Sequence, residues 1–289
     1  PRLHREGRRF DPGRAHMSDD ADLTLREVLD VIEGLYPPHT AQSWDRVGLV
    51  TGDPHQLVRR IHLAVDPTLD VIAEARELGA DLLLTHHPLL MRGAHSLATT
   101  SAKGASVTDL IVGDVALYVA HTNADVAADG VGFAPARACG LTDTEPLTPA
   151  EGQPLGRVGV LADAVSLRAL VVALAAALPA GAGGIRVAGP ADAVVRRVAL
   201  LGGSGDDLFD AVRASGADVY VTADLRHHPA LEAREEARGG TPYLVDAGHW
   251  ASEFVWLAAA ERALLAALGE RATRVETHIS TVRTDPWTF

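Results

Sequence analysis

The sequence has almost no cysteine and no long apolar run. Cys139 is the only cysteine among 289 residues, which excludes an intramolecular disulfide framework and a thiolate-rich zinc site. We expect Cys139 to be a small buried hydrophobic residue. No apolar stretch approaches the roughly 20 residues that a membrane span needs, because Gly, Pro or charge interrupts even the alanine-rich segments. The sequence therefore predicts no membrane partner.

Basic residues are scarce relative to acidic ones. Lys and Arg number 26 and Asp and Glu number 38, a formal net charge of −12. Broad binding to nucleic acid needs clustered basic residues, so the charge argues against a nucleic-acid partner. Residues 1–16 precede Met17 and lack the apolar segment of a secretory signal. We expect them to be a disordered extension, and we expect the protein to be cytoplasmic.

What is present is a large apolar fraction arranged as alternating strands and helices. Hydrophobic residues make up 47% of the chain, which is enough for one large domain or two ordinary ones. Apolar periodicity predicts the individual elements. They are helices at 24–35, 68–77 and 106–112 and strands at 61–65, 82–85 and 116–120. This βαβ pattern predicts an α/β fold.

The second half of the chain repeats the first. Residues 58–85 align without a gap on residues 195–222, and ten of the 28 aligned positions are identical. The period is far too long for a solenoid. A register kept through a strand, a helix and a second strand indicates two related α/β halves whose strand ends line one cleft.

The composition suggests where these halves begin and end. We place the first half at 17–139 and the second at 157–289. The intervening residues 140–156 are rich in Pro, Thr, Gly and Glu, which is typical of a linker. We expect residues 246–289 to pack back on the first half.

Two adjacent histidines, His86 and His87, stand at the C-terminal end of the strand predicted at 82–85. In open α/β sheets this is the edge where loops converge and ligands bind. Adjacent residues of an extended chain point to opposite sides, so the two imidazoles can serve two centres. By themselves they are more simply read as turn histidines that cap a strand.

Three more residues complete a candidate set of metal ligands. Asp125 follows the strand predicted at 116–120, at the same sheet edge. His249 and Glu253 are spaced i,i+4 near the start of a helix at 251–268, so both side chains leave from one helix face. Imidazole and carboxylate together suit a divalent transition ion such as Zn, Mn, Fe, Co or Ni. The alternative for this pair is an ordinary helix start with a favourable N-terminal acid.

Five motifs recur in one known family. They are Trp44-Asp45-Arg46-Val47-Gly48, Thr85-His86-His87-Pro88, His121-Thr122-Asn123-Ala124-Asp125, Gly202-Gly203-Ser204-Gly205 and Asp246-Ala247-Gly248-His249-Trp250-Ala251-Ser252-Glu253. Together they resemble the Nif-three-like dinuclear metal proteins, whose members are commonly named GTP cyclohydrolase 1 type 2 homologues. The resemblance runs from about Leu25 to the C-terminus.

The resemblance implies a ligand set and an assembly. It implies two divalent ions per chain in the cleft between the two α/β halves, held by His86, His87, Asp125, His249 and Glu253, with Glu253 shared between the ions. It also implies a toroidal homohexamer, for which the polar and β-branched alternation at 274–283 supplies a plausible strand edge. The chain departs from the family pattern at Arg46, where Asn is common, and it lacks the family's long central insertion.

Seven further residues are expected to contact substrate or to support the metal site. These are Trp44, Asp45, Gly203, Ser204, Arg226, His227 and His228. The glycine-rich turn at 202–205 fits either an anion site at backbone amides or a tight strand-to-helix turn. His227 and His228 repeat the first His-His-Pro motif without a carboxylate companion, which is why we do not assign them as ligands.

These residues favour a metal-dependent hydrolase in which two ions activate a bridging water to attack a small, nucleotide-like substrate. The catalytic group would be the metal-bound water, and no side chain is assigned that role. One alternative is a non-catalytic metal-binding or metal-delivery protein. Another is a protein-binding regulator whose metal site is structural.

Overall fold

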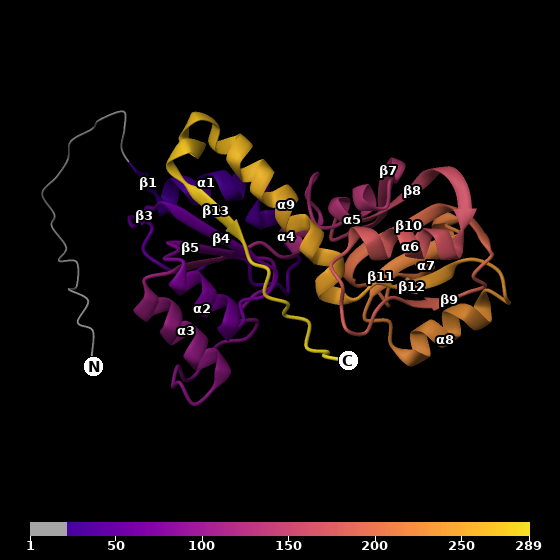
Figure 1. Ribbon diagram of the computed structural model, residues 1–289, viewed down its shortest axis with the longest axis horizontal. Coiled ribbons are helices and arrows are strands. Elements are labelled where there is room, and N and C mark those ends of the chain that lie inside the picture. The colour runs from indigo at the N-terminus through magenta and orange to yellow at the C-terminus, as the bar shows by residue number, and fades with distance from the viewer. Residues whose placement is uncertain (1–21) are drawn as a thin grey trace, which may run out of the picture.

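The computed structural model describes residues 22–289 and consists of two α/β halves joined through one long helix, α9 (His249–Leu268) (Figure 1). This confirms the predicted fold class. The expected disordered extension, residues 1–16, lies outside the described residues. Within 22–289, none of the helices combines the length and apolarity that crossing a membrane requires.

The first half is built on a five-stranded sheet. Its strand order is β13 (Glu276–Ile279), β4 (Arg60–Ala64), β5 (Leu82–Thr85), β6 (Ala116–Val119) and β2 (Gly48–Thr51). The first four strands are parallel to one another, and β2 pairs antiparallel with β6. A short antiparallel pair, β1 (Leu23–Thr24) and β3 (Leu57–Val58), lies beside it.

Helices cover both faces of this sheet. Leu82 and Leu84 pack in the cluster that includes α1 (Leu25–Leu35) and α9, whereas Leu83 packs with α2 (Leu69–Glu77) and α3 (Ala102–Gly113). All three leucines are fully buried, and each stabilises the fold by about 1.5–3 kcal/mol relative to an exposed side chain. The apolar run before His86 is therefore continuous because both of its faces are covered.

Local signals set the ends of these helices. Thr24 caps α1 in a capping box with Glu27, and Pro37 follows the helix end. The loops of this half also contain three short helices, namely η1 (Pro38–Thr40), α4 (Thr122–Asp125) and α5 (Phe133–Ala138). Cys139 is buried directly after α5, and burial raises the pKa of its thiol to about 12.

The second half is built on a six-stranded sheet. Its strand order is β7 (Thr142–Ala150), β8 (Gln153–Ser166), β10 (Val194–Ser204), β11 (Val219–Ala223), β12 (Tyr243–Asp246) and β9 (Arg186–Ala188). Strands β10, β11 and β12 are parallel, and the outer strands are antiparallel to their neighbours. Its helices are α6 (Leu167–Ala177), α7 (Phe209–Ser215) and α8 (His227–Glu236).

The sequence repeat has a structural reason. In the first half, Asp81 Oδ2 accepts hydrogen bonds from the backbone N–H groups of Arg59 and Arg60, at 2.8 and 3.0 Å. In the second half, Asp218 Oδ2 accepts the equivalent bonds from residues 196 and 197, both at 2.8 Å. The Gly two residues before each aspartate, at positions 79 and 216, has the left-handed backbone that ends a helix. In each half the shared aspartate thus joins the start of one parallel strand to the start of the next.

Residues 140–156 form secondary structure where a linker was expected. They contain β7 and the start of β8, an antiparallel hairpin at the edge of the second sheet. Pro146 and Pro149 are tolerated there because an edge strand need not donate every ladder hydrogen bond. Glu151 and Gly152, both at positive φ, make the turn. A composition rich in Pro and Gly fits an edge hairpin as well as it fits a linker.

The C-terminal segment returns to the first half. Helix α9 contacts α1 and β4 of the first half and β10 and β11 of the second. It continues through η2 (Gly269–Arg274) into β13, which pairs with β4 in parallel. The first residues of α9, the long yellow helix in Figure 1, therefore lie at the junction of the two halves.

Candidate metal centre

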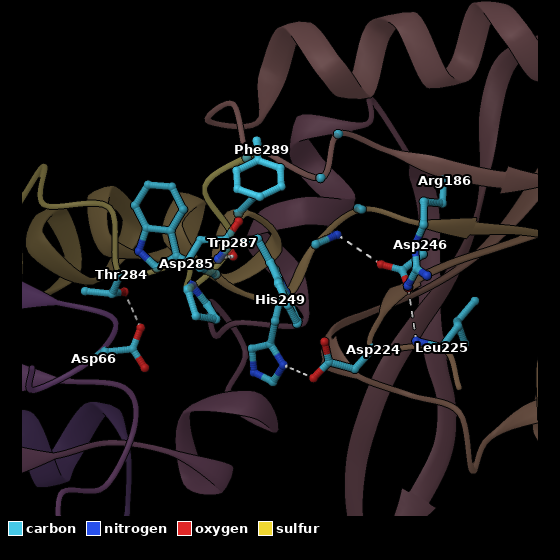
Figure 2. A pocket seen from close by; sticks show the side chains of 18 of the residues that line it. Asp66, Arg186, Asp224, Leu225, Asp246, His249, Thr284, Asp285, Trp287 and Phe289 are labelled. Atoms are coloured by element: carbon cyan, nitrogen blue, oxygen red, sulfur yellow. Dashed lines mark hydrogen bonds and ion pairs between the residues drawn. The ribbon is translucent and has the colours of Figure 1, made fainter. Parts of the chain in front are cut away.

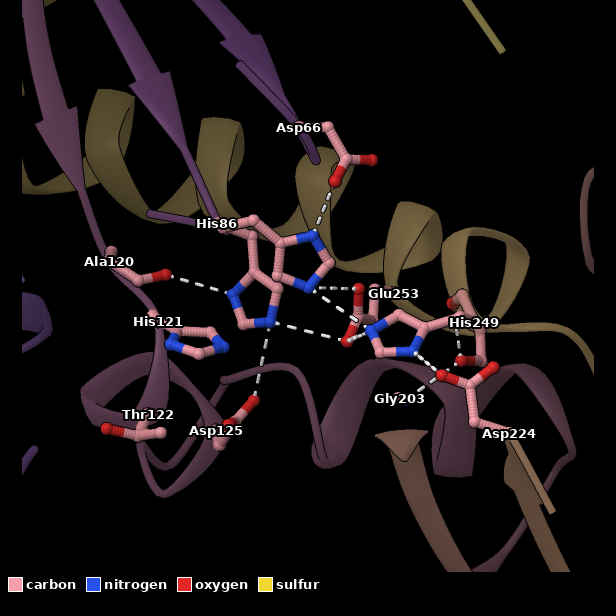
Figure 3. Close-up of polar contacts among 12 residues, drawn as sticks. Asp66, His86, Ala120, His121, Thr122, Asp125, Gly203, Asp224, His249 and Glu253 are labelled. Atoms are coloured by element: carbon pink, nitrogen blue, oxygen red, sulfur yellow. Dashed lines mark hydrogen bonds and ion pairs between the residues drawn. The ribbon is translucent and has the colours of Figure 1, made fainter. Parts of the chain in front are cut away.

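The five residues predicted as metal ligands lie together at the junction between the halves (Figure 3). His86 and His87 follow β5, Asp125 ends α4, and His249 and Glu253 lie in the first turns of α9. Their side chains meet because parallel strands end at one sheet edge and α9 starts there.

Glu253 lies at the centre of this group, with imidazoles on either side. Its Oε1 is 3.1 Å from His249 Nε2 and 3.5 Å from His86 Nε2, and its Oε2 is 3.1 Å from His87 Nε2. Asp125 Oδ1 is 3.7 Å from His86 Nε2 on the far side. We call these five residues the ligand cluster.

Two features of the ligand cluster fit a bound cation. Glu253 Oε2 is buried and receives no hydrogen bond of good geometry from residues 22–289, although buried carboxylate oxygens are normally satisfied. The Nε2 atoms of His87 and His249 also lie 3.2 Å apart, facing each other. A cation between these atoms would satisfy all three of them.

The other ring nitrogen of each histidine is held from outside the cluster. Nδ1 of His86 is 3.0 Å from the carbonyl oxygen of Ala120. Nδ1 of His87 is 2.7 Å from Asp66 Oδ1, and Nδ1 of His249 is 2.8 Å from Asp224 Oδ2. An acceptor at Nδ1 keeps a proton there, so that the inward-facing Nε2 is the nitrogen through which an ion can bind, the arrangement found around metal-binding histidines.

Asp66 and Asp224 were not predicted from the sequence. Asp224 follows directly on the parallel strand β11, and Asp66 comes two residues after the end of the parallel strand β4, at the sheet edge that carries the ligands. A polar residue in that position was the signal that could have found them.

The carboxylates set the charge of the cluster. Burial opposes protonation of His87 and of His249. At His87, Glu253 and Asp66 outweigh burial and raise the pKa to about 11. Asp224 and Glu253 likewise raise the pKa of His249 to about 10. Burial also opposes ionisation of Glu253, yet the charges of His87 and His86 hold its pKa well below the usual range. Without an ion, the cluster therefore keeps protons that an ion would displace.

A cavity of about 720 Å³ opens beside His87 and His249 (Figure 2). One wall is the C-terminal segment 284–289, including the largely exposed rings of Trp287 and Phe289. Thr284 Oγ1 donates a hydrogen bond to Asp66, which in turn holds His87. The C-terminal segment and the ligand cluster are thus connected through one carboxylate.

Comparison with known proteins identifies the family. The model of the Duf34/NIF3 (NGG1p interacting factor 3) family matches residues 23–286. The chain belongs to the Duf34/NIF3 family. A Streptomyces coelicolor protein named GTP cyclohydrolase 1 type 2 homolog is 47% identical over 269 residues, covering 91% of this chain and 93% of its own. A Mycobacterium tuberculosis protein of the same name is 33% identical, covering 92% of this chain and 97% of its own.

Solved structures agree with this family assignment. A Bacillus cereus protein described as related to NIF3 superposes with a TM-score of 0.85 at 25% identity, covering 93% of this chain and all of that one. Reduced HcgD from Methanocaldococcus jannaschii superposes with a TM-score of 0.75 at 28% identity, covering 91% and 99%.

The motif at residues 44–48 contacts a further histidine beside the ligand cluster, His121. Asp45 is buried and accepts hydrogen bonds from His121 Nδ1 at 2.9 Å and from the backbone N–H of Thr122 at 3.0 Å. Burial works against the Asp45 charge, but these bonds hold its pKa well below the usual range. The Trp44 ring contacts the His121 ring edge-on at 5.9 Å. Arg46 donates to the carbonyl oxygens of residues 44 and 45.

His121 begins the motif at residues 121–125 but was not among the five residues predicted as metal ligands. One ring nitrogen each from His86, His87 and His121 lie within 4.8 Å of one another. The signal was available, because His121 follows β6 at the same sheet edge as Asp125.

Gly203 supports the cluster by lacking a side chain. It has a φ of +72°, and a Cβ there would lie 2.3 Å from Glu253 Oε1 and 3.4 Å from His249 Nε2. Its N–H donates to Ser252 Oγ at 3.0 Å. The neighbouring Ser204 is exposed at the end of β10. This glycine turn brings the second sheet against Glu253, which favours the tight-turn interpretation of residues 202–205.

The structure does not bring Arg226, His227 and His228 to the ligand cluster. The two histidines are exposed in the first turn of α8 and contact each other, with ring centroids 5.2 Å apart. Arg226 forms an ion pair with Asp206. Helix α8 runs along the lower side of the second half in Figure 1. The four residues inserted after Thr222 explain the difference, because they place Asp224 beside His249 and carry the second His-His-Pro motif away.

Proposed function

We propose that this NIF3-family chain is a divalent-metal-dependent hydrolase with a two-ion centre that acts on a small, nucleotide-like substrate. The observation that carries the proposal is the position of Glu253, with His86 beside one oxygen, His87 beside the other, and Oε2 lacking a hydrogen bond within the described residues. A carboxylate so placed suits a bridge between two ions. The name GTP cyclohydrolase 1 type 2 homolog, carried by the relatives above, supports a nucleotide-like substrate.

The residues divide into two groups around the bridge. His86 and Asp125 would hold one ion, and His87 and His249 the other. Two ions in such a centre lower the pKa of a bridging water and polarise the bond that it attacks. Imidazole and carboxylate ligands fit Zn, Mn, Fe, Co or Ni equally.

The side chains around the ligand cluster prepare it for this chemistry. Asp66 and Asp224 keep the Nδ1 protons of His87 and His249 in place, so that each Nε2 is free to bind an ion. Asp45 orients His121 in the same way. With its ring centroid 5.0 Å from that of His86, His121 can serve as a further ligand or carry a proton to a reacting group.

The cavity beside the ligand cluster supports a small substrate. Its volume of about 720 Å³ suits one small molecule. Trp287, whose side chain is 69% exposed on the cavity wall, offers an aromatic face on which a heterocyclic base can stack. Arg186, at the opposite side in Figure 2, forms an ion pair with Asp246 on the cavity wall.

Turnover on a panel of nucleotides and phosphoesters, with and without added metal, tests the proposal. We expect hydrolysis that requires metal and that is lost in Glu253→Ala together with the metal. His228→Ala is the control, because His228 lies outside the ligand cluster and should leave metal content unchanged. A protein that carries two ions, turns over no substrate and passes its metal readily to an apo-protein would instead be a metal-delivery protein.

A further inference from the structure

A second group of potential ligands lies inside the first half, away from the ligand cluster. His62 is the middle residue of β4, and His278 lies directly opposite it in β13. Glu74 reaches the pair from α2, which covers this face of the sheet. His87, by contrast, lies beyond the ends of the strands. Strand β13 thus brings together two histidines that are 216 residues apart.

The three side chains are in contact. His62 Nε2 is 3.0 Å from Glu74 Oε2, and His62 Nδ1 is 3.1 Å from His278 Nδ1. The two rings are nearly parallel, with planes 8° apart and centroids separated by 5.0 Å. Ser280 Oγ donates to Glu74 Oε2 at 2.5 Å. One ligand atom from each of the three residues lies within 4.8 Å of the others.

We propose that His62, Glu74 and His278 form a separate binding site for one divalent transition-metal ion of the zinc class. Zinc binds imidazole nitrogen and carboxylate oxygen at about 2.0–2.2 Å, which places neighbouring ligand atoms roughly 3.3 Å apart in a tetrahedral site. The 3.1 Å between the Nδ1 atoms of His62 and His278 is close to that spacing, whereas Glu74 contacts the other ring nitrogen of His62, Nε2, at 3.0 Å.

The composition of the group and its access from the surface support an ion. His62 is itself fully buried, with Glu74 and His278 as the hydrogen-bond partners that its ring nitrogens need. Two histidines and one glutamate are the protein ligands of known three-ligand zinc sites, which leave the fourth position to water. The Glu74 side chain is 24% exposed, so an ion can enter from the surface of α2.

One ring nitrogen binds one ion, so binding must replace a present contact. The ion takes the place of the hydrogen bond between the two Nδ1 atoms, and a rotation of Glu74 supplies the third ligand. The bound ion would then tie β13 to β4 and α2. Without an ion, the same atoms form a hydrogen-bonded chain from Ser280 through Glu74 and His62 to His278, which is the alternative that experiment must exclude.

Anomalous diffraction at the zinc edge, on crystals of the full chain grown with zinc, tests the site directly. We expect a peak between His62 and His278, in the wild type and also in Glu253→Ala, because the site does not depend on the ligand cluster. No peak there while the ligand cluster is occupied would overturn the proposal and leave the proposed function untouched.

Metal content in solution gives a second test. His278→Ala should lower the zinc content by one ion per chain, because it removes a ligand from the edge strand β13. His55→Ala, which removes an exposed histidine of the same half, should change nothing. Glu74→Gln keeps the size of the side chain but loses its charge, so it should weaken zinc binding at this site at least tenfold. Equal zinc content in the wild type and His278→Ala would show that the hydrogen-bonded chain alone is present.

Discussion

At the scale of single residues, the histidines of the ligand cluster depend on partners that bind no metal themselves. Asp66 is the clearest case, because its two oxygens contact His87 Nδ1 and Thr284 Oγ1. Burial disfavours its charge, but the hydrogen bond and charge of His87 lower its pKa overall. Asp66 therefore stays ionised at neutral pH and can orient the imidazole.

We predict that Asp66→Ala weakens metal affinity by about 10–100-fold, the usual effect of losing such an orienting carboxylate. The fold should survive, since Asp66 lies at the end of β4 and not in the core. Competition with a chromophoric chelator measures the affinity. Asp163→Ala, an exposed carboxylate of β8, is the control, and equal affinities for both variants would contradict the orienting role.

Gly203 offers a second prediction at this scale. Gly203→Ala should lower metal content, because the new Cβ would lie 2.3 Å from Glu253 Oε1 and must displace it. It should also cost about 1–2 kcal/mol in unfolding free energy from the left-handed backbone alone. Gly216→Ala has a similar φ, +68°, with open space at the Cβ.

Urea unfolding and elemental analysis of these two glycine variants separate the effects. The control should show the backbone cost with full metal content. If Gly203→Ala keeps its metal as well, the close approach of β10 to Glu253 has no functional consequence.

At the scale of elements, the start of α9 links protonation to metal binding. His87 and His249, with pKa values raised to about 11 and about 10, are protonated in the metal-free protein at neutral pH. Raised pKa values stabilise the metal-free fold below the ordinary histidine value near 6.5, and this contribution is lost as the pH rises through 10 to 11. An ion must displace the same protons.

We therefore predict that metal affinity rises with pH from about 6.5 to 10, by up to tenfold per pH unit for each proton displaced. Calorimetric titration at pH 7.5, in buffers with different ionisation enthalpies, counts the protons released, and we expect about two per chain. Asp66→Asn should release fewer, because the variant loses a carboxylate whose hydrogen bond and charge help to raise the pKa of His87. Binding with no proton release would show that these imidazoles are neutral before the metal arrives.

At the scale of the whole molecule, the edge strand β13 is a possible contact between subunits. Strand β13 is the last strand of its sheet and pairs with β4 in the described chain, so its outer edge can accept a strand from another subunit. We predict a homohexamer, the assembly that the family resemblance implies, with a solution mass six times the 30.4 kDa of one chain. Light scattering over a range of concentrations measures the mass, and a concentration-independent monomer would exclude the ring.

Local sequence patterns were sufficient for the βαβ units and for the place of each ligand motif on its own strand or helix. A strand buried on both faces reads as an apolar run, and in a parallel sheet the residue after such a run lies at the ligand edge, as His86 does. His249 and Glu253 share a helix face because of the i,i+4 spacing. These features depend on residues close in sequence, so the sequence by itself determined them.

Other features arose only from tertiary contacts. Asp45 meets His121 across 76 residues, and His62 meets His278 across 216, distances over which no periodicity carries information. Residues 140–156 became a hairpin because the neighbouring β10 offered an edge to pair with. The inserted residues 223–226 moved His228 outward and placed Asp224 beside His249. In each case the partner comes from a different element, and only packing of the two halves around α9 decides which side chains meet.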